Sequence, residues 1–453
     1  MINIKTNSKK VQPGDTFVAL RGINSDGHSY IKAAIENGAT KIIAEEGNYS
    51  VETIIVEDTR VYLENLLYET YQDILDDMNI IGITGTNGKT TSCYLIYEAL
   101  NIMGVKCGYI GTIGFYLNEK VYDLPNTSPD ICDMYDMFVQ AYNSGYKNIA
   151  IEVSSQGLSY GRLNLIPFDI AIFTNLTQDH LDYHKTMENY ALAKTKLFKQ
   201  VKEDGYRLIN IDDDYCDYYK IDNYLTYGFN YSDYQIKNMK LTPNGSYFEI
   251  KNYNISTKLI GKYNIYNTAC AVIVLDLLKY TKEQIEYVIP KLLPPPGRMD
   301  IVNYGSNMIV IDYAHTPDAM LNIINTIKEI NHHNTYIVFG CTGSRDRGKR
   351  PIMMQMALEN AKFVYVTSDD LHEEVFEDIV QDMLDGNMKN HYLVEQNRGK
   401  AISLAISKLE SNDILLILGK GHESVIVVGD KRIPFNDREE VLKVINSHVE
   451  VNN

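Results

Sequence analysis

A short Gly-rich loop between an apolar run and a helical stretch limits the folds open to this chain. Residues 79–83 are mostly apolar, residues 85–90 read Gly-Thr-Asn-Gly-Lys-Thr, and residues 91–103 have helical periodicity. Backbone N–H groups of such a turn at a helix N-terminus bind phosphate, the lysine adds charge, and the hydroxyl after it can hold Mg²⁺. We predict strand, loop and helix in an α/β domain. The residues expected to bind the ATP phosphates are Gly85, Thr86, Asn87, Gly88, Lys89, Thr90 and Thr91.

Changes of pattern divide the chain into three predicted domains, 1–78, 79–297 and 298–453. The first has β-like pieces at 16–20, 41–44 and 53–56 and a helical piece at 30–37, which is typical of a small α/β unit. Buried strands at 149–153 and 169–174 join the phosphate-loop strand, predicting a mostly parallel central sheet. After the cluster Pro294–Gly297, β-like and helical runs alternate, which predicts a Rossmann-like sheet with ligand groups beyond the strands' carboxyl ends.

Composition excludes several classes of protein. The formal net charge of −16 argues against a nucleic-acid partner, because phosphate-backbone binding needs excess Lys and Arg. Neither an N-terminal signal nor an apolar run long enough to span a bilayer is present, so we expect no membrane insertion and a cytoplasmic location. The six cysteines lack the spacing of a zinc site or a disulfide framework and are expected to be small buried hydrophobes.

Phosphoryl transfer from a nucleotide needs metal near the phosphate loop, so carboxylates and a histidine should follow nearby strands. Glu152 ends one predicted strand, and His180 follows the next. Taken singly, Glu152 could cap a helix and His180 could be an ordinary loop histidine.

Together these stretches resemble the Mur ligases, the peptidoglycan-precursor amide ligases related to folylpolyglutamate synthase. Residues 79–91 resemble the family's ATP loop, Glu152–Ser155 match EVSS, and Thr174–Asp182 match TNLTxDHLD. The resemblance implies that Thr90 and Glu152 take part in binding Mg²⁺ and that His180 positions a second metal ion. It also implies that CO₂ carbamylates Lys194, which would convert an ammonium into a metal-binding carboxylate. From sequence alone, Lys194 reads as a solvated helix lysine.

Further motifs extend the resemblance to the nucleotide. Residues 261–269 resemble GxxNxxNxxAA, whose second Asn, here Asn267, reads the adenine edge; an amide can donate and accept at once, as a purine edge requires. Gly297–Asp300 resembles PGRxE, and Asp312–Pro317 matches DYAHTP. Arg298 would contact phosphate, and Asp312 the ribose or the lysine–phosphate network. We therefore expect ATP at a domain interface.

The resemblance also implies a muropeptide substrate. Residues 1–78 resemble a UDP-binding domain, in which Ser8 would contact uridine, and Asn126–Pro129 resembles NTTP. The positions that match muropeptide contacts are Thr127, Ser128, Ser154 and Arg162. The expected reaction phosphorylates the D-Glu side chain of UDP-N-acetylmuramoyl-L-Ala-D-Glu with ATP, and a diamino acid then attacks the acyl phosphate. The expected catalytic residues are Lys89, His180, Lys194 and Arg298.

The identity of the diamino acid depends on one departure from the family pattern. Residues 339–351 resemble FGCGGDRDxxKRP, in which Arg345 would hold the amino acid's carboxylate, and Gly419–Glu423 matches GKGHE, whose Glu423 could bind a distal ammonium. Enzymes that add meso-diaminopimelate carry DNPR where this chain has Asp369, Asp370, Leu371 and His372. With the arginine replaced and Glu373 and Glu374 nearby, we expect L-lysine or a similar diamino acid to be slightly favoured.

Other interpretations stay open at this point. The amino acid could be meso-diaminopimelate, with a protonated His372 partly replacing the arginine, or residues 369–374 could be an exposed acidic loop that touches nothing. A ligase of folylpolyglutamate or other metabolism would share the fold. A scaffold or P-loop switch protein would bind nucleotide without amino-acid-dependent ADP release. We expect a monomer.

Overall fold

The N-terminal part of the chain forms a small parallel sheet in this computed structural model, which describes residues 3–22, 25–242, 244–330, 332–387 and 389–451. The sheet has the order β1-β2-β3-β4. Its elements are β1 (Ile4–Lys5), η1 (Ser8–Lys10), β2 (Thr16–Val18), η2 (Gly27–Tyr30), α1 (Ile31–Glu36), β3 (Lys41–Ala44) and β4 (Glu52–Ile55). Phe17, Ile42 and Ala34 form its small core.

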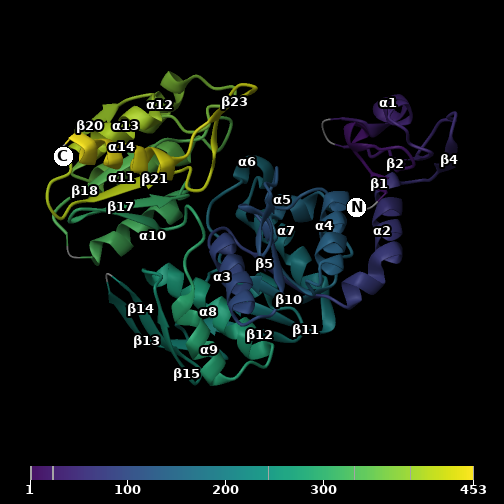
Figure 1. Ribbon diagram of the computed structural model, residues 1–453, viewed down its shortest axis with the longest axis horizontal. Helices are drawn as coiled ribbons and strands as arrows, with labels where there is room; N and C mark the ends of the chain where they lie inside the picture. Colours follow the sequence, from purple (N-terminus) through teal and green to yellow (C-terminus); the bar gives the residue numbers. More distant parts are fainter. Residues whose placement is uncertain (1–2, 23–24, 243, 331, 388, 452–453) are drawn as a thin grey trace.

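A long helix that the sequence analysis did not predict, α2 (Thr59–Asp76), follows this sheet. Its N-terminus is capped by Asp58, whose side chain accepts from the backbone N–H groups of Arg60 and Val61. Leu63 and Leu67, one helical turn apart, are buried in the same core as residues of α4 (Ile131–Asn143). The helix therefore joins the N-terminal part to the central part, as Figure 1 shows.

The central part is an eleven-stranded sheet with the order β15-β14-β13-β12-β11-β10-β5-β9-β6-β7-β8. Its strands are β5 (Asn79–Thr84), β6 (Cys107–Gly111), β7 (Gly114–Leu117), β8 (Glu119–Tyr122), β9 (Asn148–Glu152), β10 (Phe168–Phe173), β11 (Val201–Asn210), β12 (Tyr224–Gly228), β13 (Tyr234–Thr242), β14 (Gly245–Ile250) and β15 (Tyr253–Thr257). The strands from β13 to β6 pair in parallel, and antiparallel strands extend both edges. This is the mostly parallel sheet that was predicted.

Helices cover both faces of the central sheet. They are α3 (Lys89–Ile102), α4, α5 (Ser155–Ser159), α6 (Leu181–His184), α7 (Met187–Lys199), η3 (Cys216–Tyr219), α8 (Lys262–Leu277), α9 (Lys282–Val288) and η4 (Ile289–Lys291). Side chains of β5 point to both faces of the sheet. Ile80 lies in the core with α4 and α7, whereas Ile81 and Ile83 lie in the core with α3 and α8. Because β10 and β9 flank β5, the segments after these three strands meet at one edge of the sheet.

The C-terminal part is a six-stranded sheet with the order β16-β17-β21-β18-β19-β20, parallel except for β16. Its elements are β16 (Asp300–Tyr304), β17 (Asn307–Asp312), α10 (Pro317–Lys328), β18 (Thr335–Phe339), α11 (Lys349–Asn360), β19 (Phe363–Val366), α12 (Phe376–Leu384), β20 (Tyr392–Val394), α13 (Arg398–Ser407), β21 (Ile414–Leu418), the hairpin β22 (Val425–Val428) and β23 (Lys431–Pro434), and α14 (Asp437–Val451). Helices α10, α11 and α12 pack on one face and α13 and α14 on the other, so the sheet is doubly wound.

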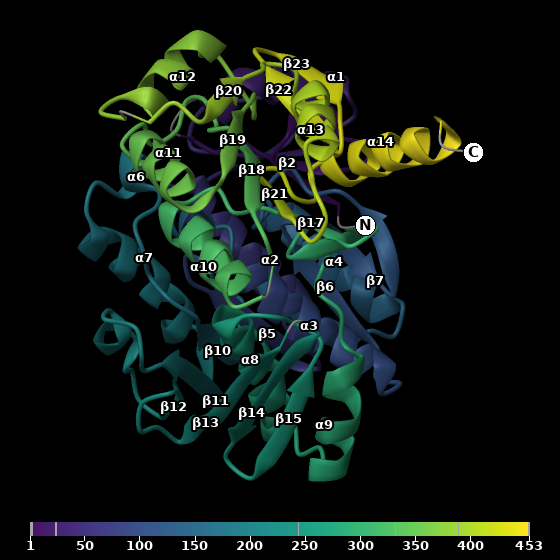
Figure 2. The ribbon, with the colours of Figure 1, turned by 90° about the vertical axis from the view of Figure 1, so that its left-hand side faces the viewer.

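The three-part α/β fold agrees with the predicted fold class, whereas the boundaries at residues 78 and 297 stay predictions. Figures 1 and 2 show α10 on the side of the C-terminal unit that faces the central part. All six cysteines are free and buried, as expected. Within the described ranges, every helix is too short or too polar to cross a bilayer.

Candidate active site

The phosphate loop runs from the end of β5 to the start of α3. Two glycines allow it to do so: Gly85 and Gly88 have φ angles of 150° and 84°. A Cβ on Gly88 would lie 2.4 Å from Asn267 Oδ1, so only glycine fits there. The neighbouring strand holds the loop, because Asn175 accepts from the backbone N–H groups of Thr86 and Asn87 through its carbonyl and side-chain oxygens, each at 2.8 Å.

Two lysines converge on this loop. Lys89 Nζ donates to the carbonyl oxygens of Gly85 and Thr86 at 3.0 and 2.8 Å, and Lys194 Nζ donates to the Gly85 oxygen at 2.8 Å. Lys194 is buried and lies 4.5 Å from the centre of the Tyr190 ring, so it is no solvated helix lysine. Burial, together with the charge of Lys89, lowers the pKa of Lys194 well below its ordinary value. A neutral amine is the form that can react with CO₂.

Glu152, at the end of β9, is fully buried and accepts four hydrogen bonds. Thr90 Oγ1 donates to Oε2 at 2.8 Å, the Thr112 N–H and hydroxyl donate to the two oxygens at 2.9 and 3.1 Å, and the hydroxyl of Tyr109 donates to Oε1. These bonds fix the carboxylate beside the hydroxyl that follows Lys89. The pair of Thr90 and Glu152 supplies the hard oxygen donors that Mg²⁺ prefers.

His180 lies next to a buried aspartate. Its Nε2 is 3.4 Å from Asp179 Oδ2, and burial lowers the pKa of His180. Although burial opposes it, the charges of His180, His315 and Lys349 lower the pKa of Asp179 to about 2. His180 has a φ of 55°, in the left-handed region where histidine is relatively tolerated.

The four predicted metal-binding residues are thus near the loop but not in one cluster. Thr90 pairs with Glu152, whereas His180 and Lys194 flank Tyr190, with ring centres 6.1 Å apart for His180 and Tyr190. Over the described part of the chain, the only group of three or more His, Cys, Asp and Glu side chains close enough to hold a metal is Asp369, Asp370 and Glu423. The loop donors fit Mg²⁺ chemically, and a carbamate on Lys194 would add a further oxygen ligand.

A cavity of about 340 Å³ opens between the central and C-terminal parts, beside the phosphate loop. That volume falls in the range of small-molecule sites. Its walls contain the predicted nucleotide residues Asn87, Gly88, Thr91, Asn267, Arg298 and Asp312. Asn267 Oδ1 accepts from the Ser92 hydroxyl at 3.2 Å, and its Nδ2 donates to Asn264 Oδ1 at 3.0 Å, which fixes the amide's orientation.

Arg298 links the C-terminal part to the phosphate loop. Its Nη2 donates to Thr90 Oγ1 at 3.2 Å, and its guanidinium lies 4.4 Å from the centre of the Tyr313 ring. Its Nε is buried with no partner among the described residues, as expected for a group that binds a ligand. Asp312 accepts from the N–H groups of Met299 and Ala314 at 2.7 and 2.8 Å, and burial raises its pKa to about 6.

Several cavity residues were missed by the sequence analysis. Asn175 directly follows β10, and Asp318 lies in the first turn of α10, where its Oδ2 accepts from Asn87 Nδ2 at 2.7 Å. The position of Asn175 after a buried strand was a signal, since ligand groups lie beyond strand carboxyl ends. Tyr263 and Tyr266 also line the cavity, and their place beside Asn267 in the predicted motif could have indicated them.

Most predicted muropeptide residues lie together beside Glu152. Ser128 Oγ donates to the Glu152 carbonyl at 3.1 Å and accepts from the Ser154 hydroxyl at 3.1 Å. Arg162 Nη1 donates to the Ser128 carbonyl at 2.9 Å, and the Thr127 and Thr112 hydroxyls are 3.0 Å apart. Ser8 instead lies in η1, in the N-terminal part, where its carbonyl accepts from Asn37 Nδ2 at 2.9 Å.

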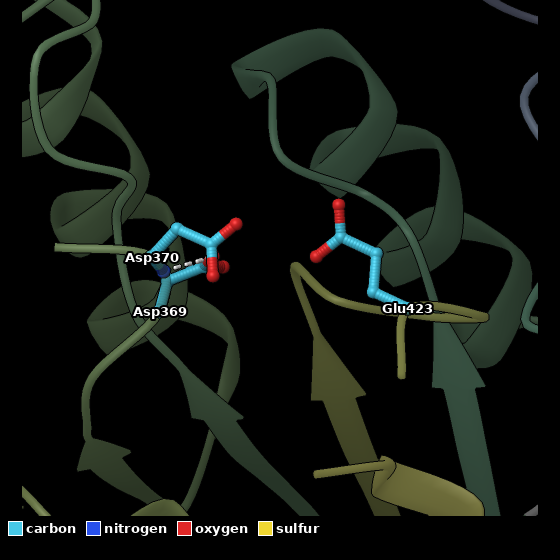
Figure 3. Close-up of side chains that lie close together, drawn as sticks. All are labelled: Asp369, Asp370 and Glu423. Carbon is cyan, nitrogen blue, oxygen red and sulfur yellow. Dashed lines mark hydrogen bonds between the residues drawn. The ribbon is translucent and has the colours of Figure 1, made fainter. Parts of the chain in front are cut away.

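The acidic residues of the C-terminal part do not form a free anionic pocket. Figure 3 shows Asp369, Asp370 and Glu423 facing one another, and the buried ammonium of Lys420 lies 3.7, 2.9 and 2.6 Å from their oxygens. Gly419 contributes by its lack of a side chain, because a Cβ there would lie 2.5 Å from Asp369 Oδ2. Lys420 thus neutralises part of the charge on which the expected preference for L-lysine rested.

Four further predicted residues of this region lie outside the acidic cluster. Glu373 is exposed, and Glu374 pairs with the buried Arg350 at 2.9 Å, so neither adds charge to the cluster, contrary to expectation. His372 is half-buried, with a φ of 49° and backbone hydrogen bonds to Val427 and Gly429. Arg345 is exposed, and its side chain bonds to no residue that the structure describes.

The fold and the site define a P-loop nucleotide-binding enzyme, in which a phosphate loop faces a second α/β unit across a nucleotide-sized cavity. Three family models match the chain: Mur ligase family, catalytic domain (residues 2–76), Mur ligase middle domain (83–275), and Mur ligase, glutamate ligase domain (297–421). The chain belongs to the Mur ligase family. It is an ATP-dependent acid–amino-acid ligase, with ATP and Mg²⁺ as its cofactors.

Curated relatives are similar over almost their full length. The UDP-N-acetylmuramoyl-L-alanyl-D-glutamate–2,6-diaminopimelate ligase of Fusobacterium nucleatum is 38% identical, covering 96% of this chain and 92% of the relative. The ligase of the same name from Aquifex aeolicus is 39% identical, covering 98% and 93%. A solved structure of such a ligase has a TM-score of 0.68 at 31% identity, covering 98% of this chain and 95% of that one. A MurF ligase from Thermotoga maritima solved with ADP shares the fold, with a TM-score of 0.68 at 20% identity and coverage of 99% and 98%.

Proposed function

We propose that this ligase joins a diamino acid, meso-diaminopimelate, to the D-Glu side chain of UDP-N-acetylmuramoyl-L-Ala-D-Glu through an acyl phosphate. The position of Glu152 supports this best. The carboxylate of Glu152 accepts a hydrogen bond from Thr90 of the phosphate loop, and the backbone carbonyl of Glu152 accepts one from Ser128 of the predicted muropeptide group. A phosphate donor and a peptide acceptor bound at these two groups would lie next to each other.

The first step transfers the γ-phosphoryl group of ATP to the D-Glu carboxylate. An oxygen of the carboxylate attacks phosphorus, the bond to the bridging oxygen breaks, and ADP leaves. Lys89 and Arg298 would face the charge that develops on the phosphate oxygens. Mg²⁺, held by Thr90 and Glu152, with His180 and carbamylated Lys194 serving a second ion, would screen the negative groups brought together.

In the second step, the amine of the amino acid attacks the acyl carbon. A tetrahedral intermediate forms, the bond to the phosphate oxygen breaks, and the amine loses a proton. Activation is needed because a carboxylate is a poor electrophile. Arg345 would bind the amino acid's own carboxylate, and its exposed position leaves its donors accessible for this.

Two observations support meso-diaminopimelate over L-lysine. Eight relatives of 35–39% identity bear the name of 2,6-diaminopimelate ligases. In addition, Lys420 offsets part of the charge of Asp369, Asp370 and Glu423, which weakens the electrostatic argument for a substrate that ends in an amine alone. Glu423 would bind the distal ammonium, and His372 would bind the distal carboxylate.

The test is phosphate release with ATP and UDP-N-acetylmuramoyl-L-Ala-D-Glu, comparing meso-diaminopimelate, L-lysine and L-ornithine. We expect the highest kcat/KM with meso-diaminopimelate. Turnover with L-lysine alone would reverse the assignment of the amino acid. Release with none of the three would contradict the muropeptide function and favour a ligase of other metabolism.

Because the reaction consumes ATP, we propose a cytoplasmic location. We also propose a monomer, which light scattering can check.

A further inference from the structure

A fully buried ion pair lies behind the acidic cluster. Arg398 begins α13 and Asp437 begins α14, and their side chains are both 0% exposed. Nε and Nη2 of Arg398 donate to the two oxygens of Asp437 at 2.7 and 2.8 Å. Buried pairs of this kind contribute little stability compared with apolar residues of similar size, so the pair calls for another explanation.

The remaining donors of Arg398 hold the ends of two strands. Nη2 also donates to the carbonyl of Leu418, the last residue of β21, at 3.0 Å, and Nη1 donates to the carbonyl of Ser368, just after β19, at 3.4 Å. The residues that follow these two carbonyls are Gly419-Lys420 and Asp369-Asp370. One guanidinium therefore binds the carbonyl groups that just precede the two halves of the cluster.

The isolated backbone bridge between His372 and Val428 joins these two segments beyond the cluster, whereas the strand ends before the cluster are not neighbours. In the sheet, β18 lies between β21 and β19, so the ends of β21 and β19 are separated by the end of β18. A long side chain reaching across β18 is a simple way to fix their separation. The planar guanidinium suits this role because the bidentate bond to Asp437 fixes its plane and orientation.

The same arginine acts on the charge of the cluster. Burial alone would raise the pKa of Asp369, but Lys420 and Arg398 together lower it below its ordinary value. Asp369 therefore stays ionised although it is buried. The packing is tight as well, since Gly419 leaves no room for a side chain next to Asp369.

We propose that Arg398 and Asp437 are positioning residues that set the distance between Asp369-Asp370 and Lys420-Glu423, and thereby the affinity for the incoming diamino acid. This role rests on the proposed function, in which that cluster binds the amino acid. It predicts an effect confined to the second step, because the pair lies in the C-terminal part, away from the phosphate loop.

The experiment compares two variants. R398K keeps the charge next to Asp437, but one ammonium cannot reproduce the planar set of bonds to Asp437, Leu418 and Ser368. R398M/D437L removes both charges without leaving either one unpaired, so it retains the fold if R398K does not. The control is D413N, since Asp413 is a buried carboxylate next to the opposite end of β21, where it accepts from Asn334 and Glu410.

Two readouts separate the steps. Hydroxylamine, added with ATP and UDP-N-acetylmuramoyl-L-Ala-D-Glu, attacks the acyl phosphate to give a hydroxamate and phosphate, which measures the first step without the amino acid. Steady-state kinetics then give KM for the diamino acid. We expect KM to rise about tenfold or more in either variant, while hydroxamate formation stays within about twofold of wild type. D413N should lower the melting temperature and leave both kinetic values unchanged.

The outcomes are distinct. A folded variant with an unchanged KM, or equal losses in both readouts, would overturn the positioning role alone. Wild-type enzyme that uses none of the diamino acids would overturn the proposed function and the positioning role with it.

Discussion

Lys89 and Lys194 donate to the same acceptor, the backbone carbonyl of Gly85, at 3.0 and 2.8 Å. Two ammonium groups at one buried oxygen repel each other, and burial lowers the pKa of both. Lys89 is compensated by the charges of Glu152 and Asp179, whereas Lys194 is compensated by Asp179 alone. Burial therefore disfavours the ammonium form at both lysines, and the pKa is lowered well below its ordinary value at Lys194.

We therefore expect activity to depend on CO₂. Enzyme prepared in CO₂-free buffer should lose most of its phosphate release and regain it with bicarbonate, and mass spectrometry should find one added CO₂ on the peptide that contains Lys194. K194A should reduce kcat by about a hundredfold. K196A is the matched control, because Lys196 is on the same helix and donates to the Leu158 carbonyl. Full activity of K194A would contradict the assignment.

Alanine substitutions at two glycines of similar backbone conformation should distinguish a loss of stability from a loss of ATP binding. Gly88 and Gly104 have φ angles of 84° and 80°, but only Gly88 has a close neighbour, Asn267. Each substitution should cost about 1 kcal/mol of unfolding free energy for the left-handed backbone. G88A should also weaken ATP binding at least about tenfold, by calorimetric titration, because it displaces the loop. Equal ATP affinities in the two variants would disprove the role of Gly88.

Substitution of His372 should change the choice of amino acid. If His372 binds the distal carboxylate of meso-diaminopimelate, H372A should lower kcat/KM for that substrate about tenfold and leave kcat/KM for L-lysine within about twofold. H372R supplies a permanent cation on the same backbone and should raise kcat/KM for meso-diaminopimelate. Equal effects on both substrates would show that His372 does not face the distal carboxylate.

The affinity for the diamino acid should fall in acid. Burial raises the pKa of Glu423 to about 7, although Lys420 opposes it. The ionised carboxylate attracts a distal ammonium and the protonated acid does not, so KM should rise up to about tenfold per unit as pH falls below 7. E423Q should have a higher KM without this slope. A slope that persists in E423Q would assign the titration to another group.

Stability should also fall in acid, through His184. Its Nε2 is 2.9 Å from Ser155 Oγ, its ring stacks on Tyr190, and burial lowers its pKa to about 4. Because the folded-state pKa lies below the unfolded value of about 6.5, this stability is present above pH 6.5 and is lost as pH falls through 4, about 3 kcal/mol in all. Urea unfolding should show that the free energy of unfolding decreases less in H184Q than in the wild type as the pH falls from 6.5 to 4. The measurement uses CO₂-free buffer so that Lys194 is not carbamylated, because a charge on Lys194 also shifts the pKa of His184.

Local features of the fold and the site were predictable from sequence. The phosphate loop depends on residues that are consecutive in the chain, so its glycines and lysine were enough to predict its position between β5 and α3. Strands of the C-terminal sheet were visible as buried apolar runs. Helix α2 was overlooked because its exposed positions are mostly polar and its tyrosines are only partly buried against the core, although Leu63 and Leu67 have helical spacing.

Interactions between distant segments were not predictable. The sequence analysis identified Asp369, Asp370 and Glu423 but not the position of Lys420 among them, since its partners lie up to 51 residues away and meet only across β18. Counting acidic residues along a loop therefore overstated the charge of the pocket. The contact of Asn87 with Asp318 is of the same kind, because 231 residues separate the two.

That contact has a consequence for the order of events. Asp318 belongs to the unit that contains the amino-acid cluster, whereas Asn87 belongs to the phosphate loop, and the cavity lies between them. A nucleotide seated in that cavity would hold the amine-binding unit over the acyl phosphate as soon as it forms. The reactive intermediate would then meet an amine sooner than water, so little ATP would be lost to hydrolysis without synthesis.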